Sequence, residues 1–201
     1  GLDAEQVLIP VDHVTLDATA ALPAIVVVRH ADTATHFVVV WKRLGKWVQV
    51  MDPALGRRWI SLSDFQNDVF RHEQSVEATE WRAWAGSAAC LDPLHARLAA
   101  LGLDRDAASS LIAEALADPE WFAMGAFDAT VRLVHSLAAA GGVAPGEEAE
   151  RVIAALFRDT RTSTGDIYTL IPPHYWSVAP DTANDDPTRE KLLLTGGVVL
   201  K

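Results

Sequence analysis

Cysteine is nearly absent from this sequence. Cys90 is the only cysteine among the 201 residues, so the chain cannot form an internal disulfide. The seven histidines include no i, i+4 pair and no His-x-x-Glu-His arrangement, which are spacings that bring two imidazoles to one metal ion. We therefore expect a chain without a metal or other cofactor, from a reducing compartment, and we predict a cytoplasmic location.

Long apolar runs and positive charge are also scarce. The longest apolar run, residues 20–28, contains Pro23 and is far shorter than the ~18 residues that span a bilayer, so we expect no direct membrane insertion. The 27 Asp and Glu against 17 Lys and Arg give a net charge of −10. Phosphate backbones and anionic lipid surfaces repel such a chain unless one face concentrates its basic residues, so nucleic acid is not an expected partner. Because the sequence begins with Gly1 and not Met, we expect it to start inside a longer polypeptide.

The remaining composition is that of a folded protein. Hydrophobic residues make up 50% and charged residues 22% of the chain, which is unlike the polar, charge-rich signature of disorder. The hydrophobic pattern predicts an α+β fold in three parts. Residues 1–76 read as a sheet domain with a central strand at 22–29, residues 77–158 as a helical module, and residues 159–201 as an irregular tail. The tail is expected to end in a hairpin that turns at Gly196-Gly197.

Two polar residues of the predicted sheet are expected to face each other. If residues 43–45 form a three-residue hairpin loop with Gly45 in the left-handed conformation, paired residue numbers add to 88. His36 then lies directly opposite Asp52, within reach of a hydrogen bond between carboxylate and imidazole. Such an Asp holds one ring nitrogen and leaves the other to act as a base toward a nucleophile. A structural cross-strand pair is the alternative, and a bulge or a two-residue turn would break the register.

Residues 22–65 resemble the second half of a known enzyme domain. They carry a Leu-Pro-Ala-Ile strand, a His-Phe-Val-Val strand, an Asp-Pro turn, a glycine and a basic residue, and a Ser-x-x-x-Phe segment, in that order. The same order is found in the double-glycine-leader peptidase domain of bacterial ABC exporters, which process bacteriocins and are papain-like cysteine peptidases. The resemblance implies a papain-like sheet in which His36 is the general base and Asp52 orients it.

The resemblance also implies a nucleophile that this chain lacks. The family's cysteine lies on a helix upstream of the histidine, whereas here no cysteine precedes His36, and Cys90 in an Ala-rich helical region reads as a buried apolar residue. We expect the chain to be inactive alone. It is either the later part of a working peptidase or a docking domain that binds leaders without cutting them. The implied partners are a secreted peptide's leader and the transmembrane and ATPase domains of an exporter, whose ATP chemistry lies outside this sequence.

Two further hypotheses concern other residues. Arg29 and His30 end a Val-rich strand as in histidine phosphatases, a remote alternative in which Arg29 holds phosphate and His30 accepts it. The tryptophans Trp41, Trp47 and Trp59 are expected in the core, the alternative being a groove for an extended peptide.

Overall fold

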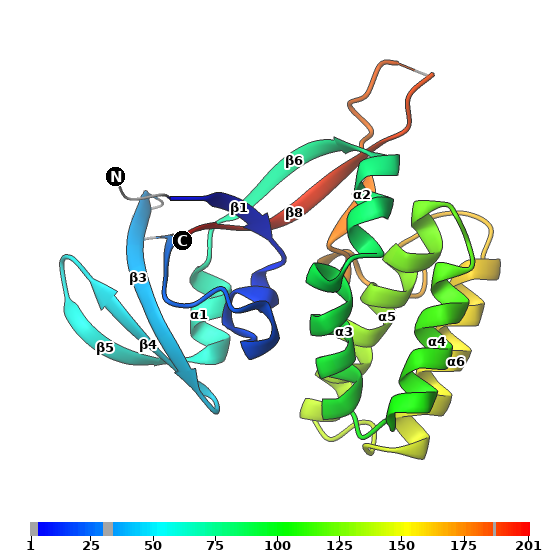
Figure 1. Cartoon of the computed structure of the whole chain (residues 1–201), viewed down its shortest axis with the longest axis horizontal. Helices are drawn as coiled ribbons and strands as arrows, with labels where there is room; N and C mark the ends of the chain where they lie inside the picture. The colour runs from blue at the N-terminus through cyan, green and yellow to red at the C-terminus, as the bar shows by residue number, and fades with distance from the viewer. Residues whose placement is uncertain (1–3, 30–33, 187) are drawn as a thin grey trace. The chain divides into compact units, whose positions relative to one another are not determined.

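The structure, a computed structural model, describes residues 4–29, 34–186 and 188–201 (Figure 1). Within these residues, eight strands form one sheet in the order β1-β8-β2-β3-β4-β5, and β6 and β7 also pair with β8. Helices make up most of the rest of the chain, so the predicted α+β class is confirmed. The chain divides into two compact units, which we call the sheet unit (residues 1–74 and 195–201) and the helical unit (residues 75–194).

The sheet unit is built from short antiparallel strands. β2 lies between β8 and β3, which confirms the prediction of a central strand. Val26, Val27 and Val28 of this strand are buried, whereas Ile25 is 40% exposed. The elements in the first part of the chain are β1 (Gln6–Ile9), η1 (Val11–Thr15), η2 (Asp17–Thr19), β2 (Ala24–Arg29), β3 (Thr35–Leu44), β4 (Trp47–Asp52), β5 (Gly56–Ser61), α1 (Leu62–Asp68) and β6 (Arg71–Glu77).

One face of this sheet is the core of the unit. Alternate valines of β3 and β4 are buried there and pack with Phe65 of α1. Ser61 caps α1, since its Oγ accepts a hydrogen bond of 3.0 Å from the Asp64 N–H. We call this side, where Val38, Val40, Val48 and Val50 point, the inner face of the sheet.

The opposite side, the outer face, carries large exposed side chains. Trp41, Trp47 and Trp59 are 48%, 47% and 42% exposed, so the expectation that they pack in the core is wrong. Strand alternation explains the exposure of two of them. Trp47 is adjacent in sequence to the buried Val48 and therefore points to the opposite face, and Trp59 pairs with Gln49, which lies between the buried Val48 and Val50.

The end of the chain differs most from the sequence-based expectation. Residues 191–200 form one continuous strand, β8 (Lys191–Leu200), and not a hairpin turning at Gly196-Gly197. β8 pairs with β7 (Val178–Pro180), β1 and β2, so it lies inside the sheet. The glycines serve close packing instead of a turn: a Cβ on Gly196 would overlap the Ile9 carbonyl oxygen, and one on Gly197 would lie 2.9 Å from Val69 Cγ1.

This packing predicts a large effect for a small change at Gly196. A methyl group there would force β1 and β8 apart, so Gly196→Ala is expected to destabilise the sheet unit by about 1–3 kcal/mol. Urea unfolding followed by circular dichroism measures the change. Gly86→Ala is the matched control, because a Cβ at Gly86 meets nothing closer than 3.6 Å. Equal stability of the two variants would contradict the close approach of the strands.

The helical unit is organised around one long helix. α5 is buried over most of its 19 residues and contacts α2, α3, α4 and α6, as expected for a helix that is apolar on nearly all sides. Ile171, Val178 and Leu192 join this core, so much of the predicted tail packs against the helices. The bounds are α2 (Ala78–Ala85), α3 (Ala88–Ala100), α4 (Arg105–Leu116), α5 (Trp121–Ala139), α6 (Glu147–Thr162) and η3 (Pro173–Tyr175).

A charged cluster lies inside the helical unit. Asp128 of α5 accepts hydrogen bonds from Arg97 Nη1 at 3.2 Å, Arg132 Nε at 2.9 Å and Ser177 Oγ at 2.8 Å. Arg97, Asp128 and Ser177 are all buried. The cluster therefore ties α3, α5 and the segment before β7 together through one carboxylate.

Candidate functional site

The β3–β4 hairpin has a different register from the predicted one. Leu44 pairs with Trp47, so the turn contains two residues, Gly45 and Lys46, and Gly45 has the predicted positive φ, at 57°. A bulge at Trp41 then shifts the pairing by one residue, because Val40 pairs with Val50 whereas Lys42 pairs with Gln49. Continuing this register places Asp52 opposite Val38. His36 is consequently a diagonal neighbour of Asp52 on the inner face, not its direct partner.

The two side chains meet nevertheless. His36 Nε2 lies 3.0 Å from Asp52 Oδ1, a hydrogen-bond distance. The His36 side chain is 27% exposed and that of Asp52 is 3% exposed, so the carboxylate is shielded from water while the imidazole reaches the surface. With Nε2 engaged by Asp52, Nδ1 is the nitrogen that would exchange a proton with a nucleophile.

Asp52 is held in place by the turn that follows it. Its Oδ1 accepts hydrogen bonds from the backbone N–H groups of Ala54, at 2.8 Å, and Leu55, at 3.3 Å. Burial alone would raise the pKa of this carboxyl, but the hydrogen bonds from Ala54, His36 and Leu55 together outweigh burial and hold the pKa below its usual value of 3.8. Asp52 is thus an anion at neutral pH. Its negative charge can stabilise the His36 imidazole when that ring accepts a proton.

Sequence reasoning missed one member of this site. Arg58 Nη2 lies 3.5 Å from Asp52 Oδ2. Asp52 pairs with Gly56 across the β4–β5 hairpin, so Arg58, two residues further, lies on the same face. The signal was the Asp-Pro turn followed by two arginines, but only the hairpin register tells which arginine turns toward the carboxylate.

Cys90 does not fit the role of a nucleophile. It lies in α3 of the helical unit, whereas His36 and Asp52 belong to the sheet unit. Its side chain is buried, and burial together with the Asp128 carboxylate raises the pKa of the Cys90 thiol to about 12. Since the thiolate is the reactive form, Cys90 is chemically inert in the folded chain.

This inertness predicts slow alkylation. At about pH 8 the folded chain is expected to react with iodoacetamide more than about 100-fold more slowly than the same chain unfolded in urea, because both thiolate formation and access are suppressed. Mass spectrometry of the single Cys90 adduct measures both rates, and the unfolded chain is the internal control. A rate in the folded chain close to the unfolded one would reopen the nucleophile hypothesis for Cys90.

The phosphatase alternative gains nothing from the structure. Arg29 ends β2, with its guanidinium 5.8 Å from the centre of the Phe70 ring. His30 lies outside the described residues. The next described element is β3, which pairs back onto β2 as a hairpin, whereas the phosphatase motif leads into a helical segment. Within residues 4–29, 34–186 and 188–201, no three His, Cys, Asp or Glu side chains are grouped to hold a metal ion.

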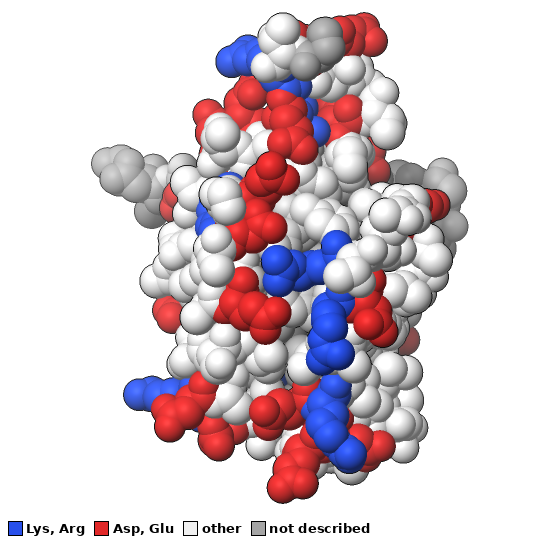
Figure 2. Space-filling view, turned by 90° about the vertical axis from the view of Figure 1, so that its right-hand side faces the viewer, with Lys and Arg blue, Asp and Glu red and all other residues white. Residues whose placement is uncertain are grey.

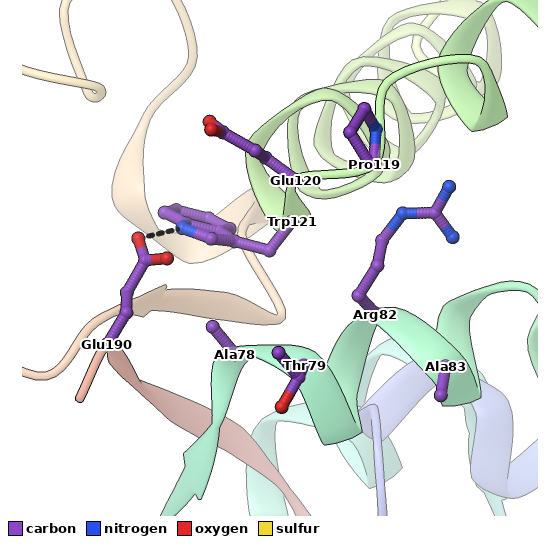
Figure 3. Close-up of a pocket in the computed structure, with 8 residues that line it drawn as sticks. All are labelled: Ala78, Thr79, Arg82, Ala83, Pro119, Glu120, Trp121 and Glu190. Carbon is purple, nitrogen blue, oxygen red and sulfur yellow. Dashed lines mark hydrogen bonds between the residues drawn. The ribbon is translucent and has the colours of Figure 1, made fainter.

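A pocket of about 400 Å³ lies in the helical unit (Figure 3). Beside it, Trp121 Nε1 donates a 2.7 Å hydrogen bond to Glu190 Oε1. Arg82 extends from α2 and donates to the backbone carbonyls of Leu116 and Asp118, so it fastens the α4–α5 connection. These contacts give the pocket walls a structural role. The lining residues are Ala78, Thr79, Arg82, Ala83, Pro119, Glu120, Trp121 and Glu190.

Comparison with known proteins identifies the region that carries His36 and Asp52. Residues 1–69 match the family model described as the Peptidase C39 family. The match covers about the first third of the chain and includes both site residues, so this region is a C39 peptidase-like domain, related to cysteine peptidases. Neither a curated protein nor a solved structure matched the chain. In the described part of the chain, no helix is both long and apolar enough to cross a membrane.

Proposed function

We propose that this chain is part of the peptidase domain of a bacterial ABC exporter and recognises double-glycine leader peptides. The observation that carries the proposal is the 3.0 Å contact between His36 and Asp52 inside the region that matches the peptidase family. A partly exposed imidazole oriented by a shielded, ionised carboxylate is the arrangement that activates a thiol.

In this proposal the nucleophile is supplied by sequence outside these 201 residues. A cysteine thiol next to His36 would transfer its proton to Nδ1, and Asp52 would stabilise the imidazolium that results. The thiolate would attack the carbonyl carbon of the second glycine, and the C–N bond would break as the imidazolium gives its proton to the leaving amine, which leaves a thioester. A water molecule deprotonated by His36 would then hydrolyse the thioester, releasing the leader and regenerating the thiol. The domain would lie on the cytoplasmic side, beside the transmembrane and ATPase domains of the exporter.

The full-length natural polypeptide provides the test. Its cysteines are labelled with iodoacetamide over about pH 5 to 9, and a thiolate paired with His36 should react well below the free-cysteine pKa of about 8.5. In parallel, a synthetic peptide with a double-glycine leader is incubated with the protein, and mass spectrometry detects cleavage after the second glycine. A reactive cysteine with cleavage supports a working peptidase.

The same experiment separates the second candidate function. Leader binding without a reactive cysteine or cleavage would favour a docking domain that holds leaders intact. If the polypeptide neither binds nor cleaves the peptide, the proposal of leader recognition is wrong in both forms. Binding is measured by isothermal titration calorimetry, with a peptide of scrambled leader sequence as the control.

A further inference from the structure

The outer face of the sheet unit combines aromatic and aliphatic side chains that are open to solvent. Besides the three tryptophans, Phe37 is 53% and Leu44 is 69% exposed. Strand pairing places them side by side, because Leu44 pairs with Trp47 and Gln49 pairs with Trp59. Ile25 and Met51 extend the same face, both pairing with Val39. This surface is four strands wide, and large apolar surfaces of this kind mark interaction sites.

Basic residues are concentrated around the same face. Residues 35–61 contain five Lys and Arg and one Asp, a net charge of +4, in a chain whose net charge is −10. Arg43 and Arg58 are on the inner face, because they pair with Val48 and Val50. Lys42 and Arg57 lie on the outer face, and Lys46 lies in the β3–β4 turn. Lys42 Nζ sits 5.9 Å from the centre of the Trp59 ring. Among the described residues, no acidic side chain forms an ion pair with Lys42, Lys46 or Arg57, so their charge is uncompensated.

The helical unit, in contrast, carries a net negative charge. The helical unit contains 9 Lys and Arg and 18 Asp and Glu, a net charge of −9. In Figure 2, acidic side chains flank a row of basic ones, so positive charge on that view is locally neutralised. Positive charge is therefore densest in residues 35–61, and Lys42, Lys46 and Arg57 bring part of it to the exposed aromatic face.

We propose that the outer face of β2–β5 docks on an anionic lipid surface. Tryptophan prefers the membrane interface, where its apolar ring and polar N–H are both satisfied. Lys42, Lys46 and Arg57 would contact acidic headgroups, each attracted by the negative surface potential. Leu44, Ile25 and Met51 would insert shallowly among the lipids. This inference does not depend on peptidase activity.

Other occupants fit the face less well. A second copy of the same face would bring two sets of uncompensated positive charge together, which is unfavourable. An extended peptide adds to a strand at the edge of a sheet. Most of these side chains lie on β3 and β4 inside the sheet, and only Trp59 and Arg57 lie on the edge strand β5. A single-stranded nucleic acid would stack its bases on aromatic rings, but Ile25, Leu44 and Met51 on this face are not aromatic.

Vesicle binding by the 201-residue chain tests this proposal. Sedimentation with phosphatidylcholine vesicles is compared with sedimentation with equimolar phosphatidylcholine and phosphatidylglycerol vesicles. Binding is expected to the anionic vesicles only and to weaken with salt. The triple variant Lys42→Gln, Lys46→Gln, Arg57→Gln is expected to bind on the order of 100-fold more weakly. The double variant Trp47→Ala, Trp59→Ala is expected to lose about tenfold or more.

The matched control removes three charges elsewhere. Arg105, Arg151 and Arg158 are exposed residues of the helical unit, and changing all three to Gln alters the net charge by the same amount. This control is expected to bind like the parent. An equal loss in both triple variants would overturn the proposal in favour of non-specific attraction. Absence of binding to anionic vesicles by the parent chain would also overturn it and leave the face to a protein partner. Circular dichroism confirms that each variant is folded.

Discussion

His36→Ala in the full-length polypeptide is expected to abolish cleavage of a double-glycine peptide, with a loss of at least about 10³-fold in kcat/KM. The imidazole is the only group placed to exchange a proton in the proposed mechanism. The fold should survive, because the His36 side chain is 27% exposed and lies at the start of β3. Discontinuous cleavage assays under single-turnover conditions measure the effect.

Asp52→Asn tests the pair more finely. Asn retains an oxygen that can accept from the Ala54 and Leu55 amides, so the turn is kept, but it removes the charge that stabilises the imidazolium. The expected loss is about 10²- to 10⁴-fold in kcat. Asp68→Asn is the matched control, because Asp68 is an exposed carboxylate of α1. Full activity of His36→Ala or Asp52→Asn, or an equal loss in the Asp68 control, would contradict the proposed roles.

The second large effect is expected in the helical unit. Asp128→Ala removes the carboxylate shared by Arg97, Arg132 and Ser177, and leaves two guanidinium groups with little solvent access and without that counter-charge. Breaking one partner of such a buried cluster costs about 3–5 kcal/mol. Because a domain is stable by only about 5–15 kcal/mol, the helical unit should be close to unfolding.

Graded variants separate charge from packing in this cluster. Ser177→Ala removes one hydrogen bond to a charged group and is expected to cost about 1.5–3 kcal/mol. Glu114→Ala breaks a surface ion pair, in which Arg161 lies 3.4 Å from Glu114, and should cost less than about 1 kcal/mol. Urea denaturation curves give all three values. An Asp128→Ala variant as stable as Glu114→Ala would show that the cluster does not hold the helices together.

The proximity of His36 and Asp52 was predictable from sequence, although the reasoning behind it was partly wrong. The hairpin, its glycine at positive φ and the shared face of the two residues follow from turn residues and strand alternation. The two-residue turn and the bulge at Trp41 do not, because both depend on how the sheet twists and packs. The shift left the pair diagonal, and the imidazole is long enough for its Nε2 to reach the Asp52 carboxylate across that distance. The catalytic role of the pair stays a prediction.

Three other features could not be predicted from the sequence, because each depends on contacts between residues far apart in the chain or conflicts with the usual behaviour of its residue type. Glycine pairs indicate a turn locally, and only the close approach of Ile9 explains why Gly196 lies within a strand. The exposure of Trp47 and Trp59 conflicts with their hydrophobicity, which is the property that sequence reasoning uses to assign a core. Asp128 sits in an apolar helical stripe, and its partners Arg97 and Ser177 are 31 and 49 residues away in sequence.

The position of β8 has a consequence for how this protein is made. Of the strands in this sheet, β8 is synthesised after all the others, yet its residues 199 and 200 pair with both β1 and β2, which are synthesised before the others. Until β8 is made, β1 lacks the strand with which it pairs among the described residues, and β2 is paired with β3 and, at Val28, with Val69. The region that contains His36 and Asp52 therefore completes its sheet only after the entire helical unit has been synthesised, and a gene fragment that stops at residue 69 lacks the strand that joins its beginning to its centre.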